Sequence, residues 1–351
     1  MFLFIGTYTN TGSKGIYVYK FNPLTGKATW VSNTDSVVNP SYVIVAPNGR
    51  YVYAVNETNG EHPGHVSSFG FQKSTGKLNF ISQQLSGGDD PCYVSVNKTN
   101  SWLFVANYSG GSASAISINK DGSLNPAAQT IQHTGASINK NRQSKAHVHS
   151  VVLSPAEDYL FTADLGMDKI LTYKFSPAQL KPLQEASTPF VSVTSGSGPR
   201  HLTFHPNRKW AYLSEEMSGT VDFFKYQSGK LSPHQNIATH PADFTGQPGT
   251  ADIHISPDGR FLYVSNRGIE NNLAIFSINQ VSGKLTLKGY QSASGKTPRN
   301  FAIDPTGQYL LVANQDSNNI VIFKRNKITG LLKETGQQIE LPKPVCLQFL
   351  K

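Results

Sequence analysis

A two-strand unit recurs along the whole chain at a period of about 50 residues, and this repeat restricts the fold more than any other feature. In its clearest copy an apolar segment runs from Pro199 to Pro206, and a second one follows from Trp210 to Glu216. Short apolar segments separated by Pro, Gly, Asn and Asp predict strands joined by tight turns. The copies start at Pro40, Pro91, Val148, Pro199, Thr250, Pro298 and Pro344.

Each copy also has a second half that predicts two more strands. A third apolar segment, such as Leu273–Phe276 or Ile320–Phe323, leads into a turn like Ser282-Gly283-Lys284 and then a short fourth segment. Four strands per unit at this period are typical of a β-propeller blade, and sustained helical periodicity is almost absent. The predicted fold class is all-β: a seven-bladed β-propeller with four-stranded blades, in which residues 1–351 form a single domain.

The two ends of the chain complement each other. The last copy, Pro344 to Phe349, ends before a second strand can form, whereas Phe2 to Tyr8 matches the second strands in pattern. We therefore expect the N-terminal strand to join the last blade and close the ring. Closure leaves only short strand edges, which limits aggregation through strand pairing.

Charge and cysteine content narrow the class of partner. Charged residues are 15% of the chain, and a net charge of +9 is spread thinly, without a long Lys/Arg run. Nucleic-acid binding usually needs a concentrated basic stripe, so we expect no nucleic-acid partner and instead an anionic small molecule in a basic cleft. Cys92 and Cys346 lie in apolar segments, which predicts buried free thiols. We expect a monomer or a weak homo-oligomer.

The N-terminal segment bears on location. Met1 to Tyr8 lacks a basic n-region and a long apolar h-region, and it is too short for a signal peptide or a membrane span. We expect no membrane partner and a cytoplasmic location. An exported protein whose signal peptide had been removed would have the same N-terminus.

Equivalent positions that face the central channel are candidates for a site, because the first strand of each propeller blade lines that channel. We call the seven residues that occupy the same position in the seven copies a column. A column that serves only the scaffold would tend to repeat one apolar residue, but the residues of three columns vary. The ends of the second strands carry Tyr8, Glu57, Tyr108, Leu165, Glu216, Arg267 and Gln315. The residues directly after the starting positions are Ser41, Cys92, His149, Arg200, Ala251, Arg299 and Val345. The next residues are Tyr42, Tyr93, Ser150, His201, Asp252, Asn300 and Cys346.

One arc of ionisable residues on three neighbouring blades stands out, formed by His149, Arg200, Glu216 and Arg267. Two guanidinium groups can hold carboxylate or phosphate oxygens, and a histidine and a carboxylate can transfer protons near neutral pH. A structural ion-pair network between adjacent blades would use the same residues. The further column residues that we expect to bind substrate are Tyr8, Glu57, His201, Asp252, Arg299 and Asn300.

Common nucleophile and nucleotide-binding motifs are missing from the sequence. It has no G-x-S-x-G, no P-loop and no G-x-G-x-x-G followed by a helix. His147 and His149 share one strand face, a spacing that could bind metal, but no carboxylate-rich cluster accompanies them. We predict no metal and no cofactor. Residues 139–149 lengthen the interval before the third copy, and long loops on a rigid scaffold often shape a binding mouth.

Four motifs together make the chain resemble the seven-bladed β-propeller lactonases, a family that includes propeller-type 6-phosphogluconolactonases and the fungal 3-carboxy-cis,cis-muconate lactonising enzyme. The motifs are Phe4-Ile5-Gly6-Thr7-Tyr8-Thr9, Ala146-His147-Val148-His149, Gly198-Pro199-Arg200-His201-Leu202-Thr203-Phe204-His205-Pro206 and Tyr263-Val264-Ser265-Asn266-Arg267-Gly268. The active-site set proposed for that family falls by motif on His149, Arg200, Glu216 and Arg267. Where the family has Asn-Glu, this chain has Glu215-Glu216, and the repeat register favours Glu216 as the inward carboxylate.

The resemblance implies a carboxylic ester hydrolase that opens a sugar-acid lactone, above all 6-phosphoglucono-δ-lactone of the pentose phosphate pathway of glucose metabolism. Either Glu216 or His149 would be the general base on water, and the arginines would hold the phosphate and stabilise the oxyanion. Two alternatives use the same residues: a lactonising or lactone-opening reaction on a dicarboxylate of the carboxymuconate type, and a non-catalytic propeller that binds an anionic ligand or a protein. An anion clamp does not distinguish phosphate from carboxylate.

Overall fold

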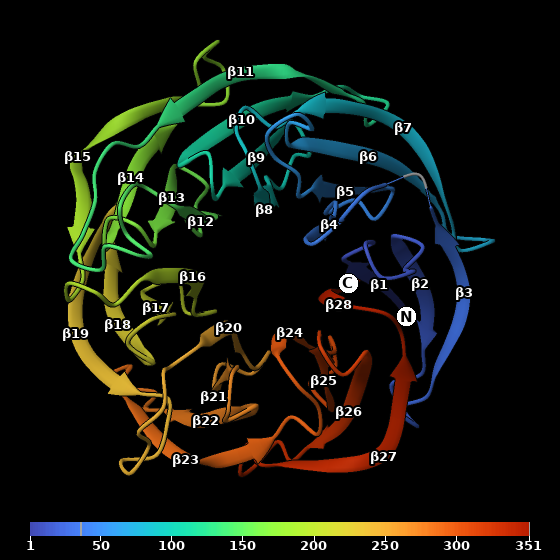
Figure 1. The fold of residues 1–351 in the computed structure, drawn as a ribbon, viewed down its shortest axis with the longest axis vertical. Helices are drawn as coiled ribbons and strands as arrows, with labels where there is room; N and C mark the ends of the chain where they lie inside the picture. Colours follow the sequence, from blue (N-terminus) through green and yellow to red (C-terminus); the bar gives the residue numbers. More distant parts are fainter. Residues whose placement is uncertain (36, 351) are drawn as a thin grey trace.

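Seven four-stranded sheets are arranged around a common axis in this computed structural model, which describes residues 1–35 and 37–350 (Figure 1). Strands joined by turns and irregular segments make up the described residues, and no helix occurs among them. The predicted all-β, seven-bladed β-propeller is therefore confirmed.

The two inner strands of each sheet carry the site. The innermost strands are β4 (Val43–Val45), β8 (Pro91–Val96), β12 (Val148–Leu153), β16 (Pro199–Phe204), β20 (Thr250–Ile255), β24 (Pro298–Ile303) and β28 (Pro344–Phe349). The second strands are β1 (Phe2–Thr7), β5 (Tyr51–Asn56), β9 (Trp102–Asn107), β13 (Tyr159–Asp164), β17 (Trp210–Glu215), β21 (Phe261–Asn266) and β25 (Tyr309–Asn314). Second strands such as β17 are buried along their whole length because neighbouring sheets cover both of their faces.

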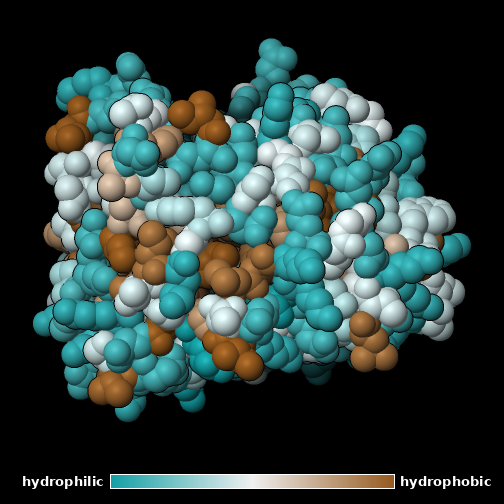
Figure 2. All heavy atoms as spheres, turned by 90° about the horizontal axis from the view of Figure 1, so that it is seen from below, coloured by the Kyte–Doolittle hydropathy of each residue, from teal (hydrophilic) through white to brown (hydrophobic). Residues whose placement is uncertain are grey.

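The two outer strands complete each blade and form the rim. The third strands are β2 (Ile16–Phe21), β6 (His65–Gln72), β10 (Ser112–Ile118), β14 (Lys169–Phe175), β18 (Thr220–Gln227), β22 (Asn272–Ile278) and β26 (Asn319–Arg325). The fourth strands are β3 (Ala28–Thr34), β7 (Lys77–Leu85), β11 (Leu124–Gln132), β15 (Leu183–Ser192), β19 (Lys230–Ala238), β23 (Leu285–Ser292) and β27 (Leu332–Glu340). Exposed and less exposed residues alternate along an outer strand such as β11. Figure 2 shows one side of this rim, where hydrophilic residues predominate.

The chain closes the ring with its own two ends. The last sheet has the order β28-β1-β2-β3, and β28 pairs with β1 through Leu3↔Phe349 and Ile5↔Leu347. The two termini accordingly lie close together in Figure 1. The predicted closure by the N-terminal strand is confirmed.

Glycines in the turns allow neighbouring blades to pack closely. Gly283, in the turn before β23, has a φ of 81°, and a Cβ atom there would lie 2.4 Å from Phe223 of the preceding blade. The Tyr212 hydroxyl of that blade donates to the Gly283 carbonyl at 2.7 Å. The recurring Gly in these turns thus permits both the left-handed backbone and the close approach of an aromatic side chain.

A bulge at the start of the inner strands turns one side chain out of the ladder. In β16, Pro199 pairs with Glu215 and His201 pairs with Ser214, so Arg200 between them has no partner. The same shift directly after the first residue occurs in β8, β12 and β24, while in β20 it extends over Ala251 and Asp252. Bulges re-aim side chains, which explains why the residue after each starting position can leave the sheet plane.

A backbone hydrogen bond fixes the residue that follows each second strand. The Glu216 N–H donates to the Gly198 carbonyl at 2.8 Å, and the Arg267 N–H donates to the Gly249 carbonyl at 3.0 Å. The equivalent bond joins the other five column residues, Tyr8, Glu57, Tyr108, Leu165 and Gln315, to the residue before the starting position of each copy. Each second strand therefore ends one residue earlier than predicted.

The first inner strand is shorter than predicted. The repeat places its start at Pro40, but β4 begins at Val43. Residues 39–41 form a tight turn in which the Ser41 N–H donates to the Asn39 carbonyl at 2.7 Å, and Asn39 has a φ of 43°. This turn delays the strand. The free thiols predicted at Cys92 and Cys346 are confirmed, and both are buried.

Candidate active site

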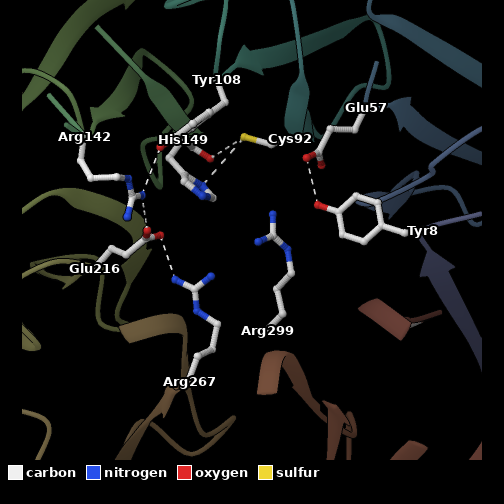
Figure 3. Close-up of a pocket in the computed structure, with 9 residues that line it drawn as sticks. All are labelled: Tyr8, Glu57, Cys92, Tyr108, Arg142, His149, Glu216, Arg267 and Arg299. Carbon is white, nitrogen blue, oxygen red and sulfur yellow. Dashed lines mark hydrogen bonds and ion pairs between the residues drawn. The ribbon is translucent and has the colours of Figure 1, made fainter. Parts of the chain in front are cut away.

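A pocket of about 320 Å³ lies at the end of the ring axis where the inner strands begin (Figure 3). Its lining comes from bulge residues of three inner strands, from five residues that follow second strands, and from one loop. The lining residues are Tyr8, Glu57, Cys92, Tyr108, Arg142, His149, Glu216, Arg267 and Arg299. The residues on the bulges and the residues that follow the second strands thus line one common site.

Three arginines converge on the carboxylate of Glu216. Arg142 Nη2 lies 2.6 Å from Oε1, while Arg200 Nε and Arg267 Nη2 each lie 3.0 Å from Oε2. Burial alone would raise the pKa of this carboxyl group, but the guanidinium charges, led by that of Arg267, hold the pKa well below its usual range. Glu216 is therefore ionised near neutral pH, and it is a weak proton acceptor.

Arg142 is a pocket residue that the sequence columns missed. It lies in the long loop before β12, and its neighbour Gln143 is fully buried and donates its side-chain amide to the Leu165 carbonyl at 2.8 Å. Asn139 Oδ1 accepts from the Arg142 N–H at 3.1 Å, which shapes the turn. The one signal in the sequence was the longer interval around residues 139–149. The expectation that a long loop shapes the mouth is confirmed for this loop.

Glu57, Tyr8 and Arg299 form the opposite wall. The Tyr8 hydroxyl donates to Glu57 Oε1 at 2.9 Å, and the Ser41 hydroxyl donates to the other oxygen. The Arg299 guanidinium lies 5.7 Å from the centre of the Tyr8 ring and projects toward the middle of the pocket (Figure 3). Within residues 1–35 and 37–350, Arg299 forms no ion pair with a carboxylate, so its charge is directed at the pocket.

His149 offers a neutral imidazole to the pocket. It is 4% exposed and lies on the bulge of β12, next to Tyr108 and with Nδ1 3.9 Å from Cys92 Sγ. Burial, and then the charge of Arg200, lower the pKa of His149 well below its usual value. Burial raises the pKa of the Cys92 thiol, so this cysteine is not a thiolate nucleophile.

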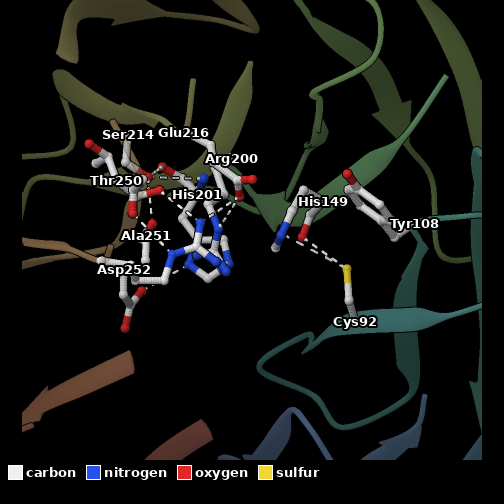
Figure 4. Close-up of polar contacts among 12 residues, drawn as sticks. Cys92, Tyr108, His149, Arg200, His201, Ser214, Glu216, Thr250, Ala251 and Asp252 are labelled. Carbon is white, nitrogen blue, oxygen red and sulfur yellow. Dashed lines mark hydrogen bonds and ion pairs between the residues drawn. The ribbon is translucent and has the colours of Figure 1, made fainter. Parts of the chain in front are cut away.

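Four predicted site residues are not part of the pocket lining: Arg200, His201, Asp252 and Asn300. Figure 4 shows the first three, and Asn300 donates its side-chain amide to Asp252. Arg200 is only 1% exposed, and its Nε donates to Glu216, which lines the pocket in its place. The other six, which line the pocket as expected, are Tyr8, Glu57, His149, Glu216, Arg267 and Arg299. Three lining residues were not predicted as site residues: Cys92, Tyr108 and Arg142.

The sequence left two questions open: which of Glu215 and Glu216 points inward, and whether His147 binds a metal ion. Glu216, and not Glu215, lines the pocket, as the repeat register predicts. His147 stacks on Tyr108, with ring centres 4.6 Å apart, and its Nδ1 lies 3.0 Å from the Tyr108 carbonyl oxygen. In the described part of the chain, no three His, Cys, Asp or Glu side chains are grouped to hold a metal ion. The absence of a metal or cofactor stays a prediction.

Fold and site together define a β-propeller with an arginine-rich pocket suited to an anionic substrate. A family model described as "Lactonase, 7-bladed beta-propeller" matches residues 2–349. The chain belongs to this family, and the predicted resemblance is confirmed.

Relatives of known name span the whole chain. The 6-phosphogluconolactonase of Formosa agariphila is 40% identical, with 99% of each chain covered, and that of Bacillus subtilis is 35% identical, with 99% of this chain and 97% of the relative covered. The solved periplasmic gluconolactonase of Pseudomonas aeruginosa superposes with a TM-score of 0.95 at 39% identity and covers 100% of this chain and 99% of its own. Nowhere in residues 1–35 and 37–350 is a helix long and apolar enough to cross a membrane.

Proposed function

We propose that this protein is a lactone hydrolase that converts 6-phosphoglucono-δ-lactone to 6-phosphogluconate. The observation that carries the proposal is the convergence of three arginines and a neutral histidine on one pocket, formed by Arg142, Arg267, Arg299 and His149. The names of the two bacterial relatives at 40% and 35% identity support the phosphorylated substrate.

The arginines supply the anion grip. Arg142 and Arg267 already hold the two oxygens of the Glu216 carboxylate, which keeps both guanidinium groups in place at the pocket wall. Arg142 is 46% exposed and stands at the mouth, where a phosphate on a long substrate would enter. Guanidinium groups bind phosphate through paired hydrogen bonds. We assign the phosphate to Arg142 together with Arg267.

His149 is the proton acceptor in our proposal, and Glu216 is not. Both groups are unprotonated near pH 7, but the two oxygens of Glu216 already accept from three guanidinium groups, whereas the neutral imidazole of His149 lines the pocket without an ion pair to any described residue and can take the proton. Glu216 instead orients the arginines. Arg299, whose charge is directed into the pocket, stabilises the oxyanion that forms on the lactone carbonyl.

The reaction that follows balances without a cofactor. The water oxygen bonds to the lactone carbonyl carbon while His149 accepts one water proton. The tetrahedral intermediate then collapses, the bond from that carbon to the ring oxygen breaks, and His149 returns the proton to the ring oxygen. The products are a free hydroxyl and a carboxylate, with one proton released to solvent.

The unphosphorylated sugar lactone is the second candidate substrate, because the gluconolactonase of Pseudomonas aeruginosa is 39% identical to this chain. A carboxymuconate-type dicarboxylate and a non-catalytic anion binder are further outcomes that an assay can reveal. The purified protein should be tested with 6-phosphogluconolactone, gluconolactone and a carboxymuconolactone, each against its spontaneous rate. Faster opening of the phosphorylated lactone, competed by 6-phosphogluconate and lost in His149→Ala, supports the proposal. No acceleration of any lactone would refute it.

We further propose that residues 1–351 act as one domain and that the protein is a monomer or weak homo-oligomer. We also propose that it works in the cytoplasm on the pentose phosphate pathway of glucose metabolism, without nucleic-acid or membrane partners. Light scattering after size exclusion measures the assembly state. Cell fractionation tests the location, and recovery in an extracytoplasmic fraction, as the name of the Pseudomonas aeruginosa relative describes for that protein, would contradict it.

A further inference from the structure

A buried chain of polar contacts continues from the pocket floor along the ring axis. Arg200 Nε donates to Glu216 Oε2 at 3.0 Å, and Arg200 Nη1 lies 3.3 Å from His201 Nε2. His201 Nδ1 lies 2.8 Å from Asp252 Oδ1 (Figure 4). All four side chains are less than a tenth exposed, so water does not compete for these contacts.

The chain of contacts fixes the tautomer of His201. A guanidinium group only donates hydrogen bonds, so His201 Nε2 must accept from Arg200. The single imidazole proton is therefore on Nδ1, from which it is donated to Asp252. Burial and the charge of Arg200 lower the pKa of His201 to about 4, in agreement with a neutral ring near pH 7.

Asp252 is held as a charged acceptor by donors from the next blade. The Asn300 side-chain amide donates to Asp252 Oδ2 at 2.5 Å, and the Phe301 N–H donates to the same oxygen at 3.2 Å. Both of these groups can only donate here, because Asn300 Oδ1 accepts from the Leu347 N–H at 2.7 Å. The site accordingly requires a carboxylate rather than an amide at position 252.

We propose that Asp252 and His201 are positioning residues, which hold the Arg200 guanidinium against Glu216 and thereby fix the arginine grip above it. Arg200 is then a buried brace for Glu216 and has no contact with substrate. The inference rests on the lactonase function proposed above. It assigns His201, Asp252 and Asn300 to a supporting layer, in place of the substrate contacts expected from the sequence.

Kinetics of matched variants test the proposal. His201→Leu and Asp252→Asn remove one link each. Arg142 and Arg267 keep their own contacts to Glu216 and still bind the anion, but without the support of Arg200 the bound lactone is less well aligned with His149. We therefore expect kcat to fall about 10- to 100-fold while KM changes less than about threefold. His201→Gln restores an acceptor toward Arg200 and a donor toward Asp252, so it should recover most of kcat. Wild-type kcat in His201→Leu and Asp252→Asn would overturn the proposal.

A second buried pair provides the control. His133 Nδ1 lies 2.7 Å from Asp164 Oδ2, with the two side chains fully buried, but neither residue lines the pocket. We expect His133→Leu to lower stability and to leave kcat and KM of the folded protein within about twofold. Equal kcat losses in His133→Leu and His201→Leu would show a general packing effect and overturn the proposal.

A measurement that does not depend on activity separates this proposal from the function. Nitrogen-15 NMR of histidine-labelled wild-type protein at pH 7, with His201→Gln to assign the signal, should show a proton on Nδ1 and none on Nε2 of His201. A proton on Nε2 would overturn the inference even if the enzyme is active. If the tautomer is as expected but no lactone is opened, the proposed function fails and the positioning contact is retained.

Discussion

The two ends of the ring axis are built from the same inner strands, yet they differ in chemistry. At the end where these strands start, five charged side chains surround the pocket: Glu57, Arg142, Glu216, Arg267 and Arg299. At the far end a larger cavity of about 550 Å³ is lined mainly by apolar residues, among them Phe204, Ile255, Ile303, Leu347 and Phe349.

The difference follows from the regularity of the ladder. Inner strands such as β16 and β24 are bulged at their starts, and Arg200 and Arg299 lose their ladder partners there. Toward the far end the register is regular, as in Thr203↔Tyr212 and Phe204↔Ala211. A bulge can turn a long polar side chain toward the axis. Along a regular strand, successive side chains point to opposite faces of the sheet and so pack against the two adjacent blades. The comparison therefore predicts that activity depends on the bulged end and hardly on the other.

The largest expected effect is that of Glu216→Gln. An amide cannot hold three guanidinium groups by charge, so the arginine grip loosens and kcat/KM should fall about 100-fold. Initial rates of lactone opening, corrected for the spontaneous reaction, measure this loss. A rate near that of the wild type would contradict a role of Glu216 in the reaction.

Glu215→Gln is the adjacent control for this variant. Glu215 is fully buried, and burial, followed by the neighbouring Asp222 carboxylate, raises the pKa of Glu215 well above its usual value. A raised carboxyl pKa in the folded state costs stability as pH rises above the unfolded pKa. Glu215→Gln should therefore keep activity and melt at a higher temperature than the wild type at neutral and alkaline pH.

Arg142→Gln is expected to have the next largest effect. The loop arginine grips the anion at the mouth but is half-exposed, so its loss should raise KM about tenfold and leave kcat within about threefold. Arg208→Gln makes the same charge change on an exposed turn after β16, at the far end, and should change neither constant. Equal KM values for the two variants would contradict the assignment of the phosphate to Arg142.

The pH dependence gives a smaller effect. Because burial and Arg200 lower the pKa of His149, the neutral base persists as the pH falls to 6. We expect kcat/KM to stay constant between pH 8 and 6 and to decline only well below pH 6.5, where His149 gains a proton. An acidic limb centred at or above pH 6.5 in a buffer series would argue against His149 as the base.

The smallest effect on activity is predicted at the far end. Phe349 packs against Phe21 with ring centres 5.4 Å apart, so Phe349→Leu should lower the free energy of unfolding by about 1–2 kcal/mol. Denaturant titration measures this loss, and kcat/KM of the folded protein should stay within about twofold. A tenfold loss of kcat/KM would show that the two ends are coupled.

Most of the fold could be predicted because each blade repeats local signals. Apolar periodicity, turn glycines such as Gly283 and the unmatched last copy at Pro344 report the strands and the closure directly. Strand ends were less exact: β4 starts later than predicted because of the turn at residues 39–41, and a backbone bond to Gly198 places Glu216 one residue beyond β17.

The sequence by itself determined the seven-bladed ring, its closure and the arc of ionisable positions, because these follow from equivalence between repeats. The tertiary structure decided which of these residues line the pocket and which are buried. Arg142 reaches Glu216 across 74 residues of sequence from a loop outside the repeat, so no column could include it. Arg200 shares a column with His149, yet Glu216 lines the pocket in its place, because burial depends on the side chains that neighbouring blades place above a position.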